Sequence, residues 1–476
     1  MSEILSKSAA WHYEPIATAT ARLKVAAILG NTAFYGIIAA ILASAIPNGS
    51  VAVSSRSFLA FAICIFAVFR LLASFLVSSF RLSNPGLLLP LISILCLASA
   101  QAVQFPGNIT VSVDPYETKQ FIIFFGSIVV AGEVMLRYTN TLGRLKVLIA
   151  TVIIVGLASS IFGIYREIFL DSPAASFIGF LDSRQGYAQF LNRNHFALLA
   201  EMSLGLNLGL LIKGRLSRKQ KLVGWIIAGI FIYSLLTVNS RGGLVSLAAL
   251  SIFATFIHTM TGKFGSGDSR IRAFLNSRSF AFRITAAVGL STAVFAIIVV
   301  ATAFVGGDRV VTRVESLPDE IQVQAQSKVN RAAIWNSTTE LIKENPVSGV
   351  GFGGYAAAIP KFDTSSGKFS LQQAHNDYLE ILANGGLIAI AFFAWFGAAV
   401  ARRAVRNLAS PHPLRGAAAF GAAIGIFSVL IHSFVDFGVH IPTNALLFSI
   451  LIVIATVNIP DDHSASAHRF RTLRYG

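Results

Sequence analysis

Four polar clusters interrupt an otherwise apolar chain and carry the residue types that could do chemistry. They read FLNRNHFA at 190–197, NSRGG at 239–243, a longer mixed segment at 331–386, and HSFVDFGVHIPTN at 432–444. The planar guanidinium groups of their arginines suit phosphate oxygens. A neutral imidazole can take a proton from a hydroxyl group, and His375 stands where the third cluster runs into an apolar stretch. The clusters predict phosphate binding and proton transfer, against the alternative of a structured loop without activity.

The arginines of the second and third clusters are the first candidates. Arg241 follows one apolar run, and Gly242-Gly243 opens the next, so its guanidinium is expected at the level of the lipid headgroups. Arg331 precedes Trp335 by four residues, about one helical turn, so the two side chains share a face. Each arginine would bind phosphate oxygens or simply anchor a helix end at the membrane interface. Trp335 is a candidate substrate-binding residue beside Arg331.

His375 is the candidate general base. A lone histidine is more often structural, but Asn376, Asp377 and Tyr378 follow it directly and favour a site. Asn376 and Asp377 are therefore substrate-binding candidates. No HxxxH pair or Asp-x-Asp motif occurs in the outer loops, so no metal site is expected.

The glycine-rich stretch SGVGFGG at 348–354 could be mistaken for a dinucleotide-binding fingerprint. No strand is expected before it, and the loop is expected outside the cell, where nucleotides are scarce. We interpret its glycines as permitting a tight turn and close backbone approach.

Composition excludes a soluble protein. Hydrophobic residues make up 54% of the 476 residues and charged residues only 13%, and the mean hydropathy is +0.68. A soluble chain could not bury so much apolar surface, so the fold class is an all-α polytopic membrane protein. The net charge of +16 does not indicate nucleic acid, because the basic residues fall in short loops between apolar runs.

About twelve stretches are long enough to cross the hydrocarbon core as helices. The expected spans are 25–46, 57–80, 86–104, 119–137, 146–166, 194–213, 222–239, 243–261, 283–305, 379–400, 416–435 and 443–459. No tandem repeat or appended soluble domain is visible, so residues 1–476 form one membrane domain. The polar tail after residue 459 is expected to be disordered.

The basic residues orient these spans. With a cytoplasmic N-terminus, most of the 38 Lys and Arg residues fall in inner loops such as KGRLSRKQK at 213–221. Both termini are then cytoplasmic, and the one long loop, 306–378, is periplasmic. This arrangement also places all four polar clusters on the outer face. That agreement predicts a single outward-facing site.

Isolated charged residues and cysteines within the expected spans are further candidates. Arg70 and Glu201 are the charges deepest in apolar runs, and buried charges in membranes are functional suspects. Arg70 is expected to extend toward the inner surface, and Glu201, two turns below Asn194-His195, could support the site. Cys64 and Cys96 lie in apolar runs and indicate neither a disulfide nor a metal site. No apolar region precedes residue 22, so no cleavable signal peptide is expected.

The order of the motifs resembles a known family. SRGG, then R-x-x-x-W, NPVSGVGFGGY, AHNDYLEILANGGL and HSFVDF follow one another as in the O-antigen ligase and polymerase superfamily of bacterial envelope proteins. The resemblance covers roughly residues 190–455, and HNDYLE and GVGFGG are its most specific segments. It implies a metal-independent, inverting glycosyltransferase in the bacterial inner membrane, with no cofactor. The donor would be a glycan on undecaprenyl diphosphate, and the acceptor a hydroxyl of lipid A core or of a growing glycan.

The resemblance also assigns roles to residues. By motif position, Arg241 and Arg331 resemble the diphosphate-binding arginines, and His375 resembles the histidine that activates the acceptor. Arg193, in FLNRNHFA, resembles a further basic residue near the lipid carrier. Ligation to lipid A core and polymerisation of repeat units share this donor chemistry, so the sequence leaves both open.

A transporter or flippase of lipid-linked oligosaccharides is the alternative from another class. Transporters place polar residues and broken helices near the membrane midplane, often in repeated halves. Here the polar clusters stand at span ends, which favours surface chemistry.

Overall fold

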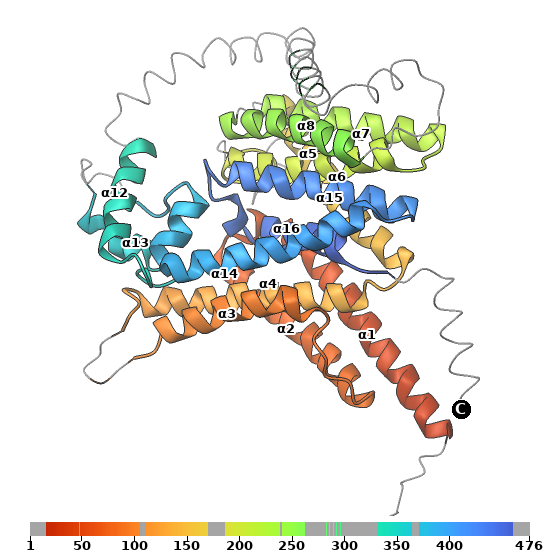
Figure 1. Cartoon of the computed structure of the whole chain (residues 1–476), viewed down its shortest axis with the longest axis horizontal. Coiled ribbons are helices and arrows are strands. Elements are labelled where there is room, and N and C mark those ends of the chain that lie inside the picture. The colour runs from red at the N-terminus through yellow and green to blue at the C-terminus, as the bar shows by residue number, and fades with distance from the viewer. Residues whose placement is uncertain are drawn as a thin grey trace, which may run out of the picture.

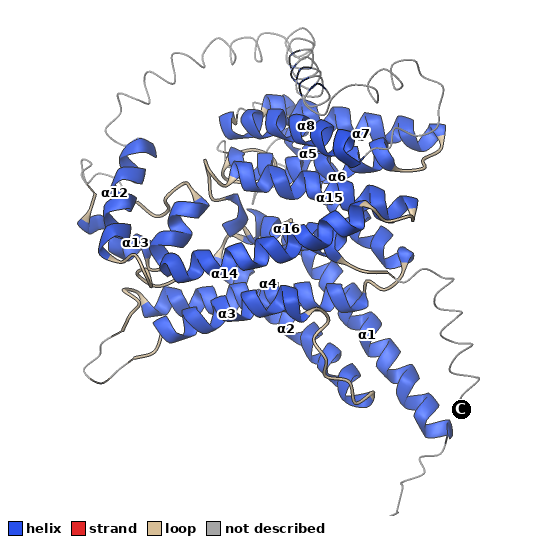
Figure 2. Cartoon of the chain, viewed as in Figure 1, coloured by secondary structure: helices blue, strands red, loops and turns tan. Residues whose placement is uncertain are grey.

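The computed structural model describes residues 16–46, 48–104, 106, 110–169, 186–238, 240–261, 331–363 and 371–459, with isolated positions between 282 and 296. Helices account for the regular structure of these residues (Figure 2). The only β feature among them is an isolated bridge between Tyr187 and Phe190. The all-α fold class is confirmed.

The first half of the described chain forms five helices before the first polar cluster. They are α1 (Ile16–Ser44), α2 (Val53–Leu76), α3 (Pro85–Gln101), α4 (Pro115–Tyr138) and α5 (Leu142–Phe169), with a short 3₁₀ turn η1 (Asn48–Ser50) between α1 and α2. Several begin at residues that suit a helix start. Asp114, for example, accepts hydrogen bonds from the backbone N–H groups of Tyr116 and Glu117, each at 3.1 Å, and thereby caps α4.

The second half supplies the elements that surround the polar clusters. They are α6 (Arg193–Lys213), α7 (Arg218–Thr237), α8 (Arg241–Thr261), α12 (Arg331–Glu344), α13 (Tyr355–Ala358), η4 (Ile359–Lys361), α14 (Asp377–Leu408), α15 (Pro413–His432), η5 (Gly438–His440) and α16 (Pro442–Thr456). In Figure 1 most of these helices run side by side, and α12 and α13 lie together at one end of the bundle.

Eight of the described helices are long and apolar enough to cross a membrane: α1, α2, α4, α5, α6, α7, α14 and α15. Three shorter apolar helices, Pro85–Gln101, Gly242–Ile257 and Pro442–Thr456, coincide with the third, eighth and twelfth expected spans. Only isolated positions of the ninth, at 283–305, are described, and residues 306–330 and 364–370 of the long loop and the tail after residue 459 lie outside the described residues. A polytopic membrane protein is confirmed, and the count of twelve spans stays a prediction.

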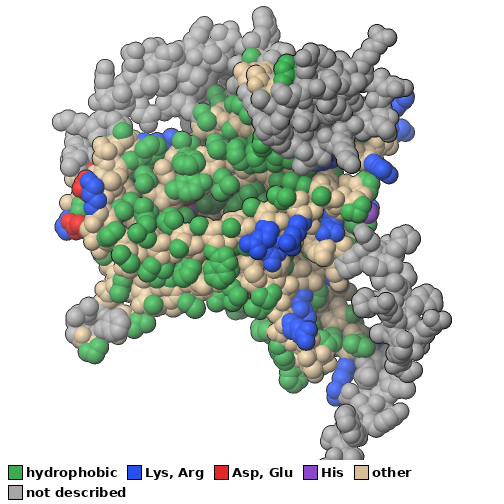
Figure 3. Space-filling model, viewed as in Figure 1, with side chains coloured by type: hydrophobic (Ala, Val, Ile, Leu, Met, Phe, Trp, Pro, Cys, Tyr) green, Lys and Arg blue, Asp and Glu red, His purple; other side chains and the backbone are tan. Residues whose placement is uncertain are grey.

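Side chains on the face seen in Figure 3 follow this arrangement. Hydrophobic side chains cover the middle of the bundle, and Lys and Arg gather mainly toward the end opposite α12 and α13. Many large apolar side chains on the helices are exposed, among them Phe58 at 72% and Phe75 at 70%. A water-soluble protein would not leave so much apolar surface uncovered, whereas lipid tails would cover it.

The centre of the bundle is the crossing of α6 and α15. A Cβ atom built on Gly209 would lie 2.2 Å from the Cα of Gly421, and one built on Gly205 would lie 2.7 Å from the backbone nitrogen of Gly425. Each helix therefore carries two glycines four residues apart, and their backbones touch. Small residues at this spacing are the usual means of close helix packing in membranes.

The glycine-rich segment 348–354 packs against a break in α14. Gly386, inside α14, has φ 63° and ψ −164°, which interrupts the helix. The backbone N–H groups of Val350 and Gly351 donate to the carbonyls of Ala383 and Asn384, and that of Leu387 donates to Pro346, all at 2.9 Å. The loop thus satisfies backbone groups that the break leaves open.

The expectation of a tight glycine turn is confirmed by the same segment. Gly351 has φ 97°, a left-handed conformation, and a Cβ there would lie 2.4 Å from Ser112 Oγ. Gln101, at the end of α3, fastens the segment from the other side, because its side-chain amide donates to the carbonyls of Ser348 (2.7 Å) and Asn384 (3.0 Å). The loop is therefore hydrogen-bonded to two of the bundle helices, α3 and α14.

The expectation for Arg70 is wrong. Its guanidinium is buried and makes a two-pronged ion pair with Glu133 of α4, with Nε–Oε2 at 3.0 Å and Nη2–Oε1 at 2.8 Å. A buried guanidinium needs an anionic partner, and one was available 63 residues away. Arg70 joins α2 to α4 and does not extend alone to the surface.

Candidate active site

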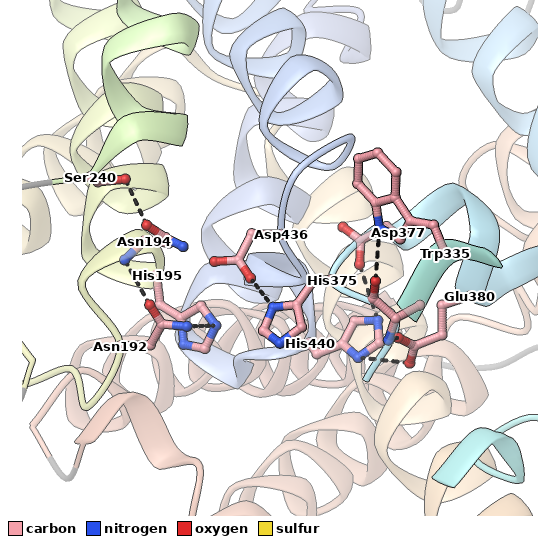
Figure 4. Close-up of polar contacts among 11 residues, drawn as sticks. Asn192, Asn194, His195, Ser240, Trp335, His375, Asp377, Glu380, Asp436 and His440 are labelled. Carbon is pink, nitrogen blue, oxygen red and sulfur yellow. Dashed lines mark hydrogen bonds and ion pairs between the residues drawn. The ribbon is translucent and has the colours of Figure 1, made fainter. Parts of the chain in front are cut away.

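The polar clusters come together where four helices begin. Asn194 and His195 lie at the start of α6, Ser240 precedes α8, Asp377 starts α14, and α16 follows the turn at 438–441. Figure 4 shows these side chains in one row, from Ser240 and Asn194 through Asp436 and His375 to Glu380. The four clusters thus lie together at one end of the bundle. That this end faces the periplasm and forms the active site stays a prediction.

Hydrogen bonds hold the starts of α6 and α8 side by side. Ser240 Oγ donates to Asn194 Oδ1 at 2.7 Å and accepts the backbone N–H of Gly243 at 3.0 Å, so Ser240 caps α8. Asn192 caps α6 by accepting the backbone N–H of Asn194 at 2.9 Å. Arg193 and Arg241 are the next residues along each chain, and their helices begin next to one another.

Each of the three candidate arginines occupies the first position of a helix: Arg193 of α6, Arg241 of α8 and Arg331 of α12. Arg193 and Arg331 are half-buried. The side chain of Arg241 lies outside the described part of the molecule, although its backbone starts α8. Helix N-termini present N–H groups and a partial positive charge, so arginines at these places add to sites that favour anions.

His375 is paired with a carboxylate that was not singled out as its partner. Its Nδ1 lies 3.2 Å from Oδ1 of Asp436, which follows α15. The His375 side chain is 34% exposed, whereas that of Asp436 is fully buried. Because a carboxylate at Nδ1 favours the N–H on that nitrogen, the lone pair is on Nε2, which faces away from Asp436. This is the tautomer that a proton acceptor requires.

Asp436 is ionised at neutral pH. Burial by itself would raise its pKa, but the hydrogen bond from His375 and the charges of His195 and His432 outweigh burial and hold the pKa at about 2. A permanent carboxylate can orient the His375 ring and stabilise the imidazolium that forms when His375 takes a proton.

The backbone at His375 is held in an uncommon conformation. Its φ of 50° is left-handed, which costs free energy for a residue with a side chain. Just before it, the Ala374 N–H donates to Glu380 Oε2 at 2.9 Å, and the Ala374 carbonyl accepts from Trp335 Nε1 at 3.1 Å. Both backbone groups of Ala374 are thus fixed, and they fix the direction of the next side chain.

The other side of His375 is fixed in the same way. Asn376 caps α14, since its Oδ1 accepts the backbone N–H groups of Tyr378 (3.0 Å) and Leu379 (3.1 Å). The Asp377 N–H donates to the carbonyl of Ser433 at 2.9 Å. Of the predicted substrate-binding residues, Asn376, Asp377 and Trp335 therefore surround His375, and each also has a structural partner.

A second histidine bridges two acidic residues beside His375. His440 Nε2 lies 3.2 Å from Asp377 Oδ1, and its Nδ1 lies 3.7 Å from Glu380 Oε1. Partial burial would lower the pKa of His440, but Glu380 and Asp377 outweigh it and raise the pKa to about 9. His440 is therefore an imidazolium at neutral pH, and it holds the carboxylate that fixes Ala374.

Phe437 fills the space between the histidines. Its ring centre lies 4.9 Å from that of His195 and 5.0 Å from that of His375, both edge to face. Asn444 of α16 fixes the neighbouring backbone by donating to the carbonyls of His195 (2.9 Å) and Gly438 (3.1 Å). The turn after α15 thus contacts α6, α14 and α16 together.

Sequence reasoning missed Asp436, His440 and Glu380 as site residues. A signal was present, because HSFVDFGVH places an Asp and two His at a span end on the same expected face as His375. Within the described residues, no group of three or more His, Cys, Asp and Glu side chains is arranged to hold a metal ion. That the reaction needs no metal stays a prediction.

Comparison with known proteins gives one family. A family model described as O-antigen ligase matches residues 226–394, which include Arg241, Arg331, Trp335, His375, Asn376 and Asp377. Arg193, Asp436 and His440 lie outside the matched segment. No curated protein matches the chain. The resemblance seen in the motifs is confirmed for this segment.

Proposed function

We propose, from the match of residues 226–394 to the O-antigen ligase family, that the chain transfers a glycan from an undecaprenyl diphosphate carrier to an acceptor hydroxyl at the periplasmic face of a bacterial inner membrane. The observation that carries the proposal is the pairing of His375 with Asp436. It supplies an oriented, partly exposed base at the end of the bundle where the three arginine-bearing helices begin.

The proposed reaction is a single displacement. The acceptor oxygen forms a bond to the anomeric carbon of the donor sugar while the bond from that carbon to the phosphate oxygen breaks. The bonding electrons leave with the lipid diphosphate, and Nε2 of His375 takes the hydroxyl proton. Attack from the face opposite the diphosphate inverts the anomeric configuration. The sugar–diphosphate bond is already activated, so no nucleotide is required.

In this scheme, side chains of the protein balance the negative charge of the diphosphate and the positive charge that forms on His375. Arg241 and Arg331, with Arg193 nearby, hold the two phosphates and stabilise the charge that develops on the leaving group. Asp436 stabilises the imidazolium of His375. The N-termini of α6 and α8 add a favourable potential for an anion.

The arginines provide the direct test. We expect Arg241→Ala or Arg331→Ala to nearly abolish transfer from lipid-linked glycan by the purified protein. Lys at either place should restore only part of the activity, because an ammonium lacks the two-pronged geometry of a guanidinium. Wild-type rates in both Ala variants would reduce these residues to interfacial anchors. Lys variants as active as wild type would mean that a positive charge alone, without the two-pronged geometry, is enough to bind the diphosphate.

Orientation is tested by labelling. After Cys64 and Cys96 are replaced by Ser, single cysteines at Thr339 in α12 and at Lys219 in α7 should react differently with a membrane-impermeant thiol reagent on spheroplasts. Both positions are exposed. Labelling at Thr339 alone is the expected result. Equal labelling, or labelling at Lys219 alone, contradicts a periplasmic site.

A transporter or flippase of lipid-linked oligosaccharides is the second candidate, and the break in α14 is the observation that favours it. Transporters use such breaks to bind substrates or ions through open backbone groups. Here residues 346–351 already occupy those groups, which supports the transferase. Movement of labelled carrier in proteoliposomes without glycan transfer would decide for the transporter.

The acceptor is identified by the glycans of a deletion strain. Loss of long glycan from lipopolysaccharide, with polymer accumulating on the carrier, would indicate ligation to lipid A core. Single repeat units left on the carrier or the core would indicate polymerisation of O-antigen or exopolysaccharide. Both outcomes keep the proposed donor chemistry.

A further inference from the structure

A second histidine–carboxylate pair lies beneath the site, fully inside the bundle. Nδ1 of His432, the last residue of α15, lies 3.0 Å and 3.2 Å from the two carboxylate oxygens of Glu201 in α6. The exposed fractions of the two side chains are 1% and 0%. Neither can reach a substrate. Yet placing a carboxylate in a membrane helix is costly, so the pair calls for a function.

The packing of α6 against α15 brings the two residues together. Glu201, Gly205 and Gly209 are spaced four residues apart and lie on one face of α6. They meet Gly421 and Gly425 of α15, whose backbones touch the α6 glycines. Because the two helices run in opposite directions, Glu201 comes opposite the end of α15, where His432 is placed. These glycine contacts set the position of α6 along α15, and they thereby keep Glu201 within hydrogen-bonding distance of His432.

The other nitrogen of His432 faces the start of α8. Nε2 is buried and has no hydrogen-bond partner among the described residues. A Cβ built on Gly242, the second residue of α8, would lie 3.6 Å from this Nε2 and 3.0 Å from Cγ2 of Val435. The first turn of α8 therefore lies over the imidazole ring, and a methyl group at position 242 would contact the ring and crowd Val435. Gly242 directly follows Arg241.

We propose that Glu201 and His432 form a positioning pair that sets where α8 begins, and through it where Arg241 meets the diphosphate of the lipid-linked donor. Glu201 orients the ring of His432 through Nδ1, and the ring faces the first turn of α8 at Gly242. The inference rests on the proposed transferase function. It adds two residues that act on donor binding without touching the donor.

The arrangement points to the donor more than to the acceptor. The side chain of His432 faces the first turn of α8, which carries the proposed donor arginine. The side chain of His375 is paired with a different carboxylate, that of Asp436, and separate hydrogen bonds hold the backbone on either side of it. Disturbing Glu201 should therefore change the donor KM more than kcat.

The test uses purified full-length protein, with transfer from lipid-linked glycan extracted from producing cells and binding of undecaprenyl diphosphate measured separately. In Gly242→Ala the added methyl group crowds Val435 at 3.0 Å, so the first turn of α8 is expected to shift over the His432 ring while the pair stays intact. In Glu201→Ala the ring loses its acceptor, whereas in Glu201→Gln an amide oxygen can still accept from Nδ1. Gly229→Ala in α7, where a Cβ meets nothing within 4 Å, is the matched control.

We expect the donor KM to rise about tenfold or more in Gly242→Ala and Glu201→Ala, the size of effect typical of a buried polar group that loses its partner. The kcat should change by less than about threefold, the affinity for undecaprenyl diphosphate should fall in parallel, and Glu201→Gln should lie between Glu201→Ala and wild type. Gly229→Ala should match wild type. Because the two Ala changes disturb one contact, their effects should not add in the double variant.

Two results overturn the inference. One is an unchanged donor KM and carrier affinity in Gly242→Ala, which keeps both buried partners and so tests the contact even if Glu201→Ala fails to fold. The other is a pair of independent effects that add. Failure of the proposed function looks different: the wild-type protein would then transfer no glycan at all, whereas the binding comparison between Gly242→Ala and Gly229→Ala could still be made.

Discussion

The two histidine–carboxylate pairs have nearly the same geometry and opposite surroundings. His375 and Asp436 are 3.2 Å apart, and His432 and Glu201 are 3.0 Å apart. The His375 side chain is 34% exposed and that of His432 only 1%. The same pairing thus suits two different roles: an exposed Nε2 is free to accept a proton from a substrate, as proposed for His375, whereas a buried one can only support the protein around it.

The pairs also differ in how the backbone presents the histidine. His432 ends a regular helix, whereas His375 has the left-handed φ of 50°. One turn connects them, because the Asp436 N–H donates to the carbonyl of His432 at 3.1 Å. Strain is concentrated at the exposed pair, where the side chain must be aimed. At the buried pair, helix packing alone is sufficient.

The sharpest contrast comes from removing each imidazole. His375→Ala should lower kcat by about 10²–10⁴-fold, the usual contribution of a general base, with little change in donor affinity. His432→Ala should mainly raise the donor KM. Steady-state kinetics with varied donor separates the two, and His412→Ala, in the turn before α15, is the control. Loss of donor binding in His375→Ala would make that residue a phosphate ligand or a structural residue.

Neutralising each carboxylate extends the comparison. Asp436→Asn should lower kcat by roughly 10–10³-fold, since an amide can donate to Nδ1 and stabilise the wrong tautomer of an exposed base. Glu201→Gln, the equivalent change in the buried pair, should lower kcat less than about threefold. Equal losses of kcat would mean that both pairs act in the chemical step.

Loss of one hydrogen bond that holds the strained backbone at His375 should lower kcat less than the changes above. Trp335→Phe removes the hydrogen bond to Ala374 and keeps most of the ring, so we expect a several-fold fall in kcat, as for the loss of one hydrogen bond. Trp225→Phe, on the exposed face of α7, controls for loss of an indole. An unchanged kcat in Trp335→Phe would show that Glu380 alone holds the backbone before His375.

The smallest expected effect concerns pH and stability. The pKa of His440 is raised from 6.5 to about 9, so its contribution to stability is complete below about pH 6.5 and is lost as pH rises through 9. The thermal unfolding midpoint of wild-type protein in detergent should therefore fall from pH 6.5 to pH 9, and less so in His440→Gln. The same slope in both proteins would assign the fall to other groups.

Much of the fold was predictable because apolar runs of membrane length leave few alternatives. Eleven of the twelve expected spans coincide with described helices. His375, Asn376 and Asp377 were singled out as candidates because polar residues at a span end are unusual, and their roles stay a prediction. The break at Gly386 was not predicted, although the pair Gly385-Gly386 within an expected span was a visible signal.

Contacts between residues far apart in the chain could not be predicted from the sequence. Arg70 and Glu133, or Glu201 and His432, meet only because particular helices pack side by side, and spacing within one helix says nothing of this. The glycines at 205 and 209 and at 421 and 425 have the spacing of closely packed membrane helices, but four such positions do not say which helices pair.

The break in α14 has a consequence for how the protein is made. Residues 346–351 leave the ribosome before residues 383–388, so the segment that completes the break exists before α14 enters the bilayer. Without it, open backbone groups would face lipid, at several kcal/mol each. The loop therefore acts as an internal partner for insertion. Shortening it at 346–351 should reduce the amount of protein in the membrane before any rate can be measured.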